Sequence, residues 1–76
     1  MESEVKEIMA RIFEVPVEEI EDDSSPDTIE SWDSLHHLNL ILALEEKYQV
    51  TFSEEEIAEL LNFQLIIMSL KEKGVA

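Results

Sequence analysis

The apolar residues of this chain recur at helical spacing in several separate segments. In the first segment, five of them fall on one face of a helix: Val5, Ile8, Met9, Ile12 and Phe13. This pattern predicts a first helix over residues 3–14, with Ser3 as its N-cap. Pro16 ends the helix, because the residue before a proline is biased away from helical geometry.

The longest amphipathic segment covers residues 34–48 and predicts a second helix. The residues expected to face inward are Leu35, Leu38, Ile41, Leu42 and Tyr48, with Leu44 near the edge of that face. Leu40 lies off this stripe, so some apolar surface is expected to stay exposed there. The helix is expected to begin at Ser34 or just after it, and Asp33 or Ser34 is a natural N-cap.

Two shorter helices are predicted near the C-terminus. Ser53 and Glu56 form a capping-box pattern at the start of a short third helix. Asn62 is expected to cap a fourth helix. Its inward residues are Phe63, Ile66, Ile67 and Leu70, and its stop signal is Lys71, Lys73 and Gly74. The pattern as a whole predicts an all-α fold of four helices.

A long connection over residues 15–33 joins the first two helices. One helical turn is expected after Pro16, with Val15, Val17 and Ile20 pinning the segment to the core. From Glu14 to Asp33 there are nine acidic residues and no basic one. Long connections in small domains are often functional. Because this one leads directly to Ser34, we interpret it as functional.

Composition limits what the chain can do. Its 76 residues are 45% hydrophobic, with one Gly and two Pro, which suits one small helical domain without a separate catalytic cleft. A formal net charge of −14 is unfavourable for binding nucleic acid or inserting into anionic membranes, and favours partners with basic patches. With no Cys, any thiol chemistry must come from an added group. No signal peptide or membrane-spanning run is evident, so a soluble cytoplasmic protein is expected.

The residues that most often carry catalysis or metals do not form a recognisable set. His36 and His37 are adjacent and point about 100° apart on a helix, so they cannot chelate one ion together, and no other His or Cys exists. A Ser34–His dyad would lack its third member. The aspartates of the acidic connection do not follow a calcium-loop spacing. We therefore expect no catalytic residue, no metal site and surface-exposed histidines.

Ser34 lies at the expected N-terminus of the second helix, where a hydroxyl could be modified. A hydroxyl at a helix N-terminus lies beside backbone N–H groups without intrahelical partners, where the helix dipole favours negative charge. This environment suits a phosphate group.

The order of these features resembles the acyl carrier proteins and the related peptidyl and aminoacyl carrier domains, over essentially the whole chain. The segments that carry the resemblance are Trp32-Asp33-Ser34-Leu35, Ala43-Leu44-Glu45-Glu46-Lys47-Tyr48 and Phe52-Ser53-Glu54-Glu55-Glu56-Ile57. The resemblance implies a single carrier domain over residues 1–76. Its fold would be a four-helix bundle of the acyl-carrier type, with a long loop between helices 1 and 2 and a short third helix.

The resemblance also implies a cofactor and a function. Ser34 would receive 4′-phosphopantetheine from coenzyme A through a phosphopantetheinyl transferase, making the chain a phosphoprotein. The thiol of that arm would carry acyl or aminoacyl groups as thioesters, and the chain itself would not be an enzyme. Asp33 would help the transferase position its metal and the reacting serine, and Leu35 would both anchor the helix and contact partners.

The second helix would be the recognition surface, through Leu35, His36, Leu38, Asn39, Leu42, Glu45 and Glu46. The other implied partners are acyl-activating ligases, ketosynthases or acyltransferases with basic docking patches, bound by a monomer. His36 and Asn39 stand where carriers of fatty acid synthesis are usually acidic, and Trp32 stands where a small residue is common. These differences favour a dedicated pathway of lipid or secondary-metabolite biosynthesis.

Other interpretations stay open. The chain could be a non-carrier acidic interaction module, an adaptor or subunit with the same fold and an unmodified Ser34. An acidic cation-binding regulator is a third possibility. Ile41, Ile57 and Ile66 could line a space for an acyl chain, although ordinary core positions are the simpler interpretation.

Overall fold

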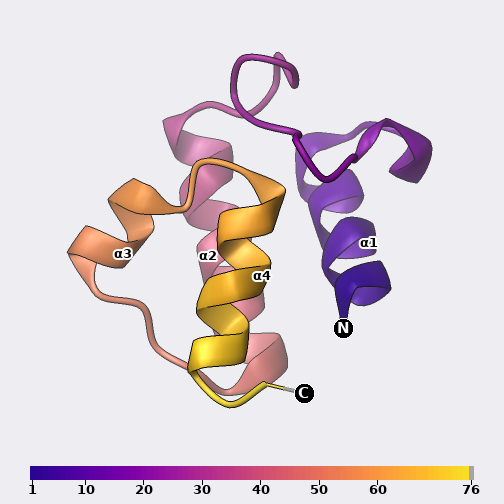
Figure 1. Ribbon diagram of the computed structural model, residues 1–76. Coiled ribbons are helices and arrows are strands. Elements are labelled where there is room, and N and C mark those ends of the chain that lie inside the picture. Colours follow the sequence, from indigo (N-terminus) through magenta and orange to yellow (C-terminus); the bar gives the residue numbers. More distant parts are fainter. Residues whose placement is uncertain (76) are drawn as a thin grey trace.

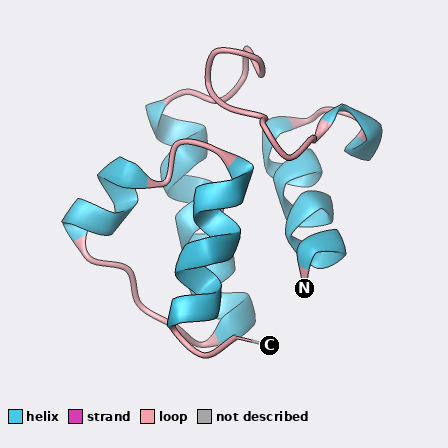
Figure 2. Cartoon of the chain, in the orientation of Figure 1, coloured by secondary structure: helices cyan, strands magenta, loops and turns pink. Residues whose placement is uncertain are grey.

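The computed structural model describes residues 1–75, and the elements in this range are all helical (Figures 1 and 2). They are α1 (Glu2–Phe13), the 3-10 turn η1 (Val17–Glu19), α2 (Ser34–Tyr48), α3 (Glu54–Glu59) and α4 (Phe63–Glu72). The predicted all-α fold, with a long loop before α2 and a short α3, is therefore confirmed. The turn expected after Pro16 is η1.

The long loop lies over the end of the bundle at which α2 begins (Figure 1). α1 runs toward this end, whereas α2 and α4 both run away from it, and the N-terminus and the last turn of α4 lie at the opposite end (Figure 1). The Cα positions extend over 28 × 23 × 19 Å. The first residue of α2 thus lies at one end of the bundle, directly after the loop.

α1 and α4 use the apolar faces that the sequence predicts. The buried residues of α1 are Val5, Ile8, Met9 and Phe13, and those of α4 are Phe63, Ile66, Ile67 and Leu70. Each set recurs at three- and four-residue spacing, so one stripe of each helix faces the core. The loop adds Ile20, Ile29 and Trp32 to the same cluster, and Val17 stays exposed.

The predicted inward face of α2 is confirmed for Ile41 but wrong for its leucines, and Leu40, which was expected off that face, is buried. The buried residues of this helix are His37, Leu40, Ile41 and Leu44. Leu35, Leu38 and Leu42 are instead 65%, 50% and 63% exposed, so Leu35 does not anchor the helix in the core. α2 is apolar on two faces, and counting His37 as polar hid the stripe that is buried.

The ends of the helices are mostly where the sequence predicts them. Ser3 lies inside α1 rather than at its N-cap, and the helix ends in a left-handed residue, Glu14, with φ 57°. Ser53 and Glu56 form the predicted capping box, and the Asn62 side chain accepts a hydrogen bond from the Leu65 N–H at 2.8 Å.

No helix in the described range, residues 1–75, is long and apolar enough to cross a membrane.

Candidate functional site

Ser34 is the first residue of α2 and is exposed to solvent. Its hydroxyl is not the helix cap, because the Asp33 side chain accepts the hydrogen bond from the His36 N–H at 2.9 Å. The His37 N–H donates to the Asp33 carbonyl and so makes the first hydrogen bond of the helix. The N–H groups at the very start of a helix have no intrahelical acceptor. Ser34 therefore presents an available hydroxyl where the helix dipole favours an anion.

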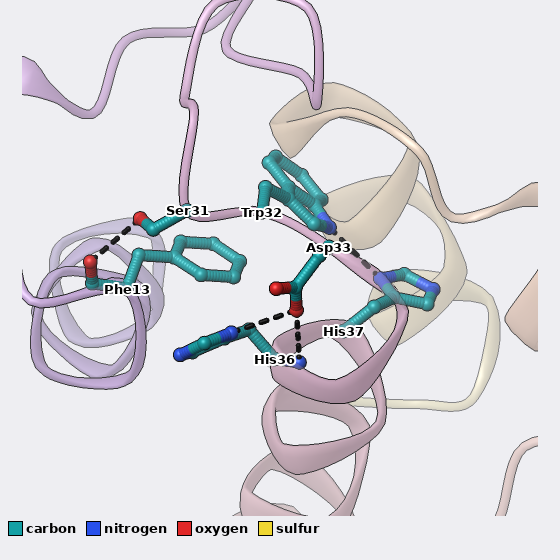
Figure 3. Close-up of polar contacts among 6 residues, drawn as sticks. All are labelled: Phe13, Ser31, Trp32, Asp33, His36 and His37. Carbon is teal, nitrogen blue, oxygen red and sulfur yellow. Dashed lines mark hydrogen bonds and ion pairs between the residues drawn. The ribbon is translucent and has the colours of Figure 1, made fainter.

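Asp33 holds the turn before Ser34 through two contacts with one residue. Besides the backbone hydrogen bond, its Oδ1 lies 2.7 Å from Nδ1 of the His36 ring (Figure 3). The hydrogen bond from the His36 backbone N–H, followed by the contact with the His36 ring, lowers the pKa of Asp33 below its ordinary value of 3.8. The carboxylate is therefore ionised at neutral pH.

Replacing His36 by Ala should raise the pKa of Asp33 toward 3.8, because the ring contact is lost while the backbone contact remains. A carboxyl whose folded pKa is depressed stabilises the fold fully above its unfolded value, and that contribution is lost as pH falls through the folded value. As the pH is lowered from 7, the free energy of unfolding should therefore decrease more steeply in the parent than in His36→Ala. Carboxyl chemical shifts followed by NMR would measure the Asp33 titration in both proteins, and urea denaturation at several pH values would measure their stability. An unchanged Asp33 curve in His36→Ala would show that the ring does not act on this carboxylate.

Two serines tie the long loop to the helices around the site. The Ser31 hydroxyl donates to the Phe13 carbonyl at the end of α1, over 2.7 Å (Figure 3). Ser24 is buried, and its carbonyl accepts the Phe63 N–H at the start of α4, over 3.1 Å. These contacts explain how a connection with so little regular structure delivers Ser34 to a defined position.

Two buried rings, those of Trp32 and His37, flank Ser34 along the chain. The Trp32 Nε1–H donates to Nδ1 of His37 at 3.0 Å (Figure 3). Nε2 of His37 lies 2.8 Å from the Ile57 carbonyl oxygen. Trp32 is 4% exposed and stacks on Phe13 of α1, with ring centroids 4.9 Å apart. His37 is 8% exposed, so the expectation of two surface histidines is wrong for this one.

Neither the periodicity of the sequence nor a known motif predicts these contacts. The sequence does offer one signal, because an indole N–H that becomes buried nearly always finds an acceptor. A tryptophan inside an acidic loop is a candidate for such burial, and His37 is one of two ring acceptors nearby.

The residues of α2 expected to contact partners fall into two groups. Leu35, Leu38, Asn39, Leu42 and Glu46 are exposed and share one face of the helix, since their spacing is three or four residues. His36 and Glu45 are half-buried. The carboxylate of Glu45 accepts the Phe52 N–H at 2.9 Å, so this residue also holds the link between α2 and α3.

The remaining candidates are ordinary structural positions. Ile41 and Ile66 belong to the core, at 2% and 0% exposure, and Ile57 packs against it. In residues 1–75, no group of three or more His, Asp and Glu side chains is arranged to hold a metal ion.

The chain matches the model of a known protein family. The family model described as the phosphopantetheine attachment site matches residues 3–67, which is most of the chain. A search of curated proteins finds no significant match.

Proposed function

Because this chain belongs to the family of phosphopantetheine attachment domains, a class of carrier domains that bear a covalent 4′-phosphopantetheine group, we propose that residues 1–76 act as a single carrier domain with Ser34 as the attachment point. The observation that supports Ser34 is its position as the exposed first residue of α2, with the capping role taken by Asp33. When bound, the group supplies a flexible thiol that holds acyl or aminoacyl groups as thioesters.

The surroundings of Ser34 fit a phosphodiester. The hydroxyl is accessible, and the backbone N–H groups that open α2 favour an added anion. In the proposed modification, the Ser34 oxygen bonds to the phosphorus next to the pantetheine of coenzyme A. The pyrophosphate bond breaks, 3′,5′-adenosine bisphosphate leaves, and the hydroxyl proton passes to a base of the phosphopantetheinyl transferase.

We assign positioning roles to the neighbours of Ser34. Asp33 fixes the first turn of α2 through its hydrogen bond with the His36 N–H, and its negative charge lies beside the reacting hydroxyl. Leu35 is 65% exposed, so its role is contact with partners rather than attachment of the helix to the core.

The docking surface is the exposed face of α2. Leu35, Leu38 and Leu42 form an apolar stripe 50–65% exposed, and Asn39 and Glu46 lie on the same side of the helix. An apolar centre beside the carboxylate of Glu46, on a chain with net charge −14, fits enzymes that combine an apolar contact with a basic patch. The transferase and the acyl-activating ligases, ketosynthases or acyltransferases that load or consume the cargo would use this face in the cytoplasm, where coenzyme A is available.

The proposed cargo is an acyl or aminoacyl group of a dedicated pathway. His36 and Asn39 support this choice, because they make α2 near Ser34 less acidic than in carriers of general fatty acid synthesis, and Trp32 supports it because it stands where a small residue is common. The competing function is an acidic interaction module with an unmodified Ser34.

The test is an intact-mass measurement after incubation with coenzyme A, Mg²⁺ and a broad-specificity phosphopantetheinyl transferase. We expect one added phosphopantetheine per chain. A folded chain that gains no mass, beside a control carrier that is fully modified, would favour the interaction module.

A further inference from the structure

We infer that His37 is a positioning residue. As a neutral imidazole it joins Trp32 to Ile57, holds the turn that carries Ser34, and releases that turn when it gains a second proton. We call the side chains of Trp32 and His37, together with the carbonyl of Ile57, the clamp. Its effect on modification of Ser34 rests on the proposed function.

The two hydrogen bonds of the ring fix its protonation. An indole N–H can only donate and a backbone carbonyl can only accept. Nδ1 of His37 must therefore carry a lone pair toward Trp32, 3.0 Å away, and Nε2 must carry the hydrogen toward Ile57, 2.8 Å away. A second proton on Nδ1 would set one N–H against another and leave the indole without an acceptor.

The clamp closes around Ser34. Trp32 precedes this residue by two positions and His37 follows it by three, so their hydrogen bond spans the turn that contains Ser34. Asp33 and His36 bridge the same turn in a second place, at 2.7 Å. The two aromatic planes of the clamp are nearly parallel, with ring centroids 6.1 Å apart and 26° between planes. Loss of the clamp would therefore loosen the first turn of α2.

The clamp also connects four parts of the fold. Trp32 belongs to the loop and stacks on Phe13 of α1, whereas His37 belongs to α2 and reaches Ile57 of α3. α3 has no buried residue of its own. The hydrogen bond from His37 is thus one of the contacts that hold α3 against α2 beside the proposed docking surface.

The ring nitrogens face neutral groups. On the same element, Asp33 and His36 are paired with each other. On α3, which packs against the ring, the charged residues are Glu54, Glu55, Glu56 and Glu59. Glu56 is paired with Lys73 at 2.8 Å. On the loop side, Glu30 is exposed and Trp32 supplies only its indole. Both ring nitrogens are directed at neutral groups, the indole of Trp32 and the carbonyl of Ile57.

An imidazole can carry a hydrogen on one ring nitrogen or on both. A second proton on the ring would therefore break the Trp32–His37 bond, free the Ile57 segment and reduce the order of the turn at Ser34. The chain has one Trp and two His, so a spectroscopic signal from Trp32 and a single histidine control are enough to follow this change.

Three variants separate the clamp from other effects. In His37→Gln, the amide oxygen can accept from the indole and the amide nitrogen can donate to Ile57, but the side chain does not titrate. His37→Phe keeps a ring of similar bulk and loses both hydrogen bonds. His36→Gln removes the other histidine and serves as the matched control.

The direct test is NMR on the unmodified protein. At about pH 7.5, the ¹⁵N pattern of His37 should show a hydrogen on Nε2 and none on Nδ1. As the solution is acidified and His37 gains its second proton, the Trp32 indole N–H signal should shift or exchange away in the parent and in His36→Gln, and stay constant in His37→Gln. A hydrogen on Nδ1, or a Trp32 transition that persists in His37→Gln, would overturn the inference.

The functional test is the rate of phosphopantetheine transfer. At neutral pH, kcat/KM should fall at least roughly three- to tenfold in His37→Phe, because the loss of one hydrogen bond shifts an equilibrium by that factor and this variant loses two. His37→Gln should restore the rate. The ratio of the parent rate to the His37→Gln rate cancels the pH dependence of the transferase itself, and it should fall below one in acid. A ratio that stays at one as the solution is acidified would show that the clamp does not position Ser34. Failure of every variant to accept the group would instead contradict the proposed function, and the NMR titration would still test the clamp.

Discussion

A Ser34→Ala variant is expected to take up no phosphopantetheine while folding as the parent does. The proposed bond forms at the Ser34 oxygen, and no other group can replace it at the start of α2. Because Asp33 and not Ser34 caps the helix, and because Ser34 is exposed, the substitution should change the free energy of unfolding by less than about 0.5 kcal/mol. Intact mass after treatment with the transferase, and urea denaturation followed by Trp32 fluorescence, measure the two effects.

Ser31→Ala is the matched control for this experiment. Ser31 lies three residues earlier, and its hydroxyl donates to the Phe13 carbonyl at 2.7 Å. We expect Ser31→Ala to accept one phosphopantetheine and to lose about 1 kcal/mol of stability, the contribution of one hydrogen bond. Full modification of Ser34→Ala would place the attachment point at another hydroxyl, and unfolding of Ser34→Ala would make Ser34 a structural residue.

Much of this fold could be predicted because several local signals agree with the global structure. α2 begins at Ser34 and ends at Tyr48, as its hydrophobic run and its Asp33 cap indicate. The capping box at Ser53 and the Asn62 cap are local hydrogen-bond patterns, so they depend little on the rest of the chain. The faces of α1 and α4 follow from periodicity, since each helix has only one apolar stripe.

The orientation of α2 was not predictable by the same means. Leu35, Leu38 and Leu42 form one apolar stripe, and Leu40, Ile41 and Leu44 form another, so hydrophobic spacing alone does not choose between them. The deciding residue is His37, which shares the second stripe and is buried because Trp32 and Ile57 satisfy both of its nitrogens. Such tertiary hydrogen bonds leave no periodic trace in the sequence.

The candidate site shows the same division. Ser34, Asp33 and the exposed part of the recognition helix follow from a short local motif. The support of that motif comes from residues distant in the chain, namely Phe13 at the end of α1, Phe63 at the start of α4 and Ile57 in α3. Ser24, Ser31 and Trp32 thus attach the loop to the helices. Within residues 1–75, the exposed acidic residues between them make no such contacts.

The two stripes of α2 make opposite predictions for Leu40→Ala and Leu42→Ala. Leu40 has 0% exposure whereas Leu42 is 63% exposed. Truncating a buried leucine costs about 2–5 kcal/mol, a large part of the roughly 4–11 kcal/mol expected for a domain of this length. Leu40→Ala should therefore lower the urea midpoint sharply or unfold the chain. Leu42→Ala should stay within about 0.5 kcal/mol of the parent.

Recognition by the transferase should show the opposite pattern, with Leu42→Ala as the impaired variant. Leu42 lies in the centre of the proposed docking face, so Leu42→Ala should raise KM, and the folded fraction of Leu40→Ala should react as the parent does. Both variants remove the same atoms from the same helix, so any difference reports the environment of the side chain and not its chemistry. If Leu42→Ala were the strongly destabilised variant, α2 would be turned as its first apolar stripe predicts, and the docking face proposed for it would be the core.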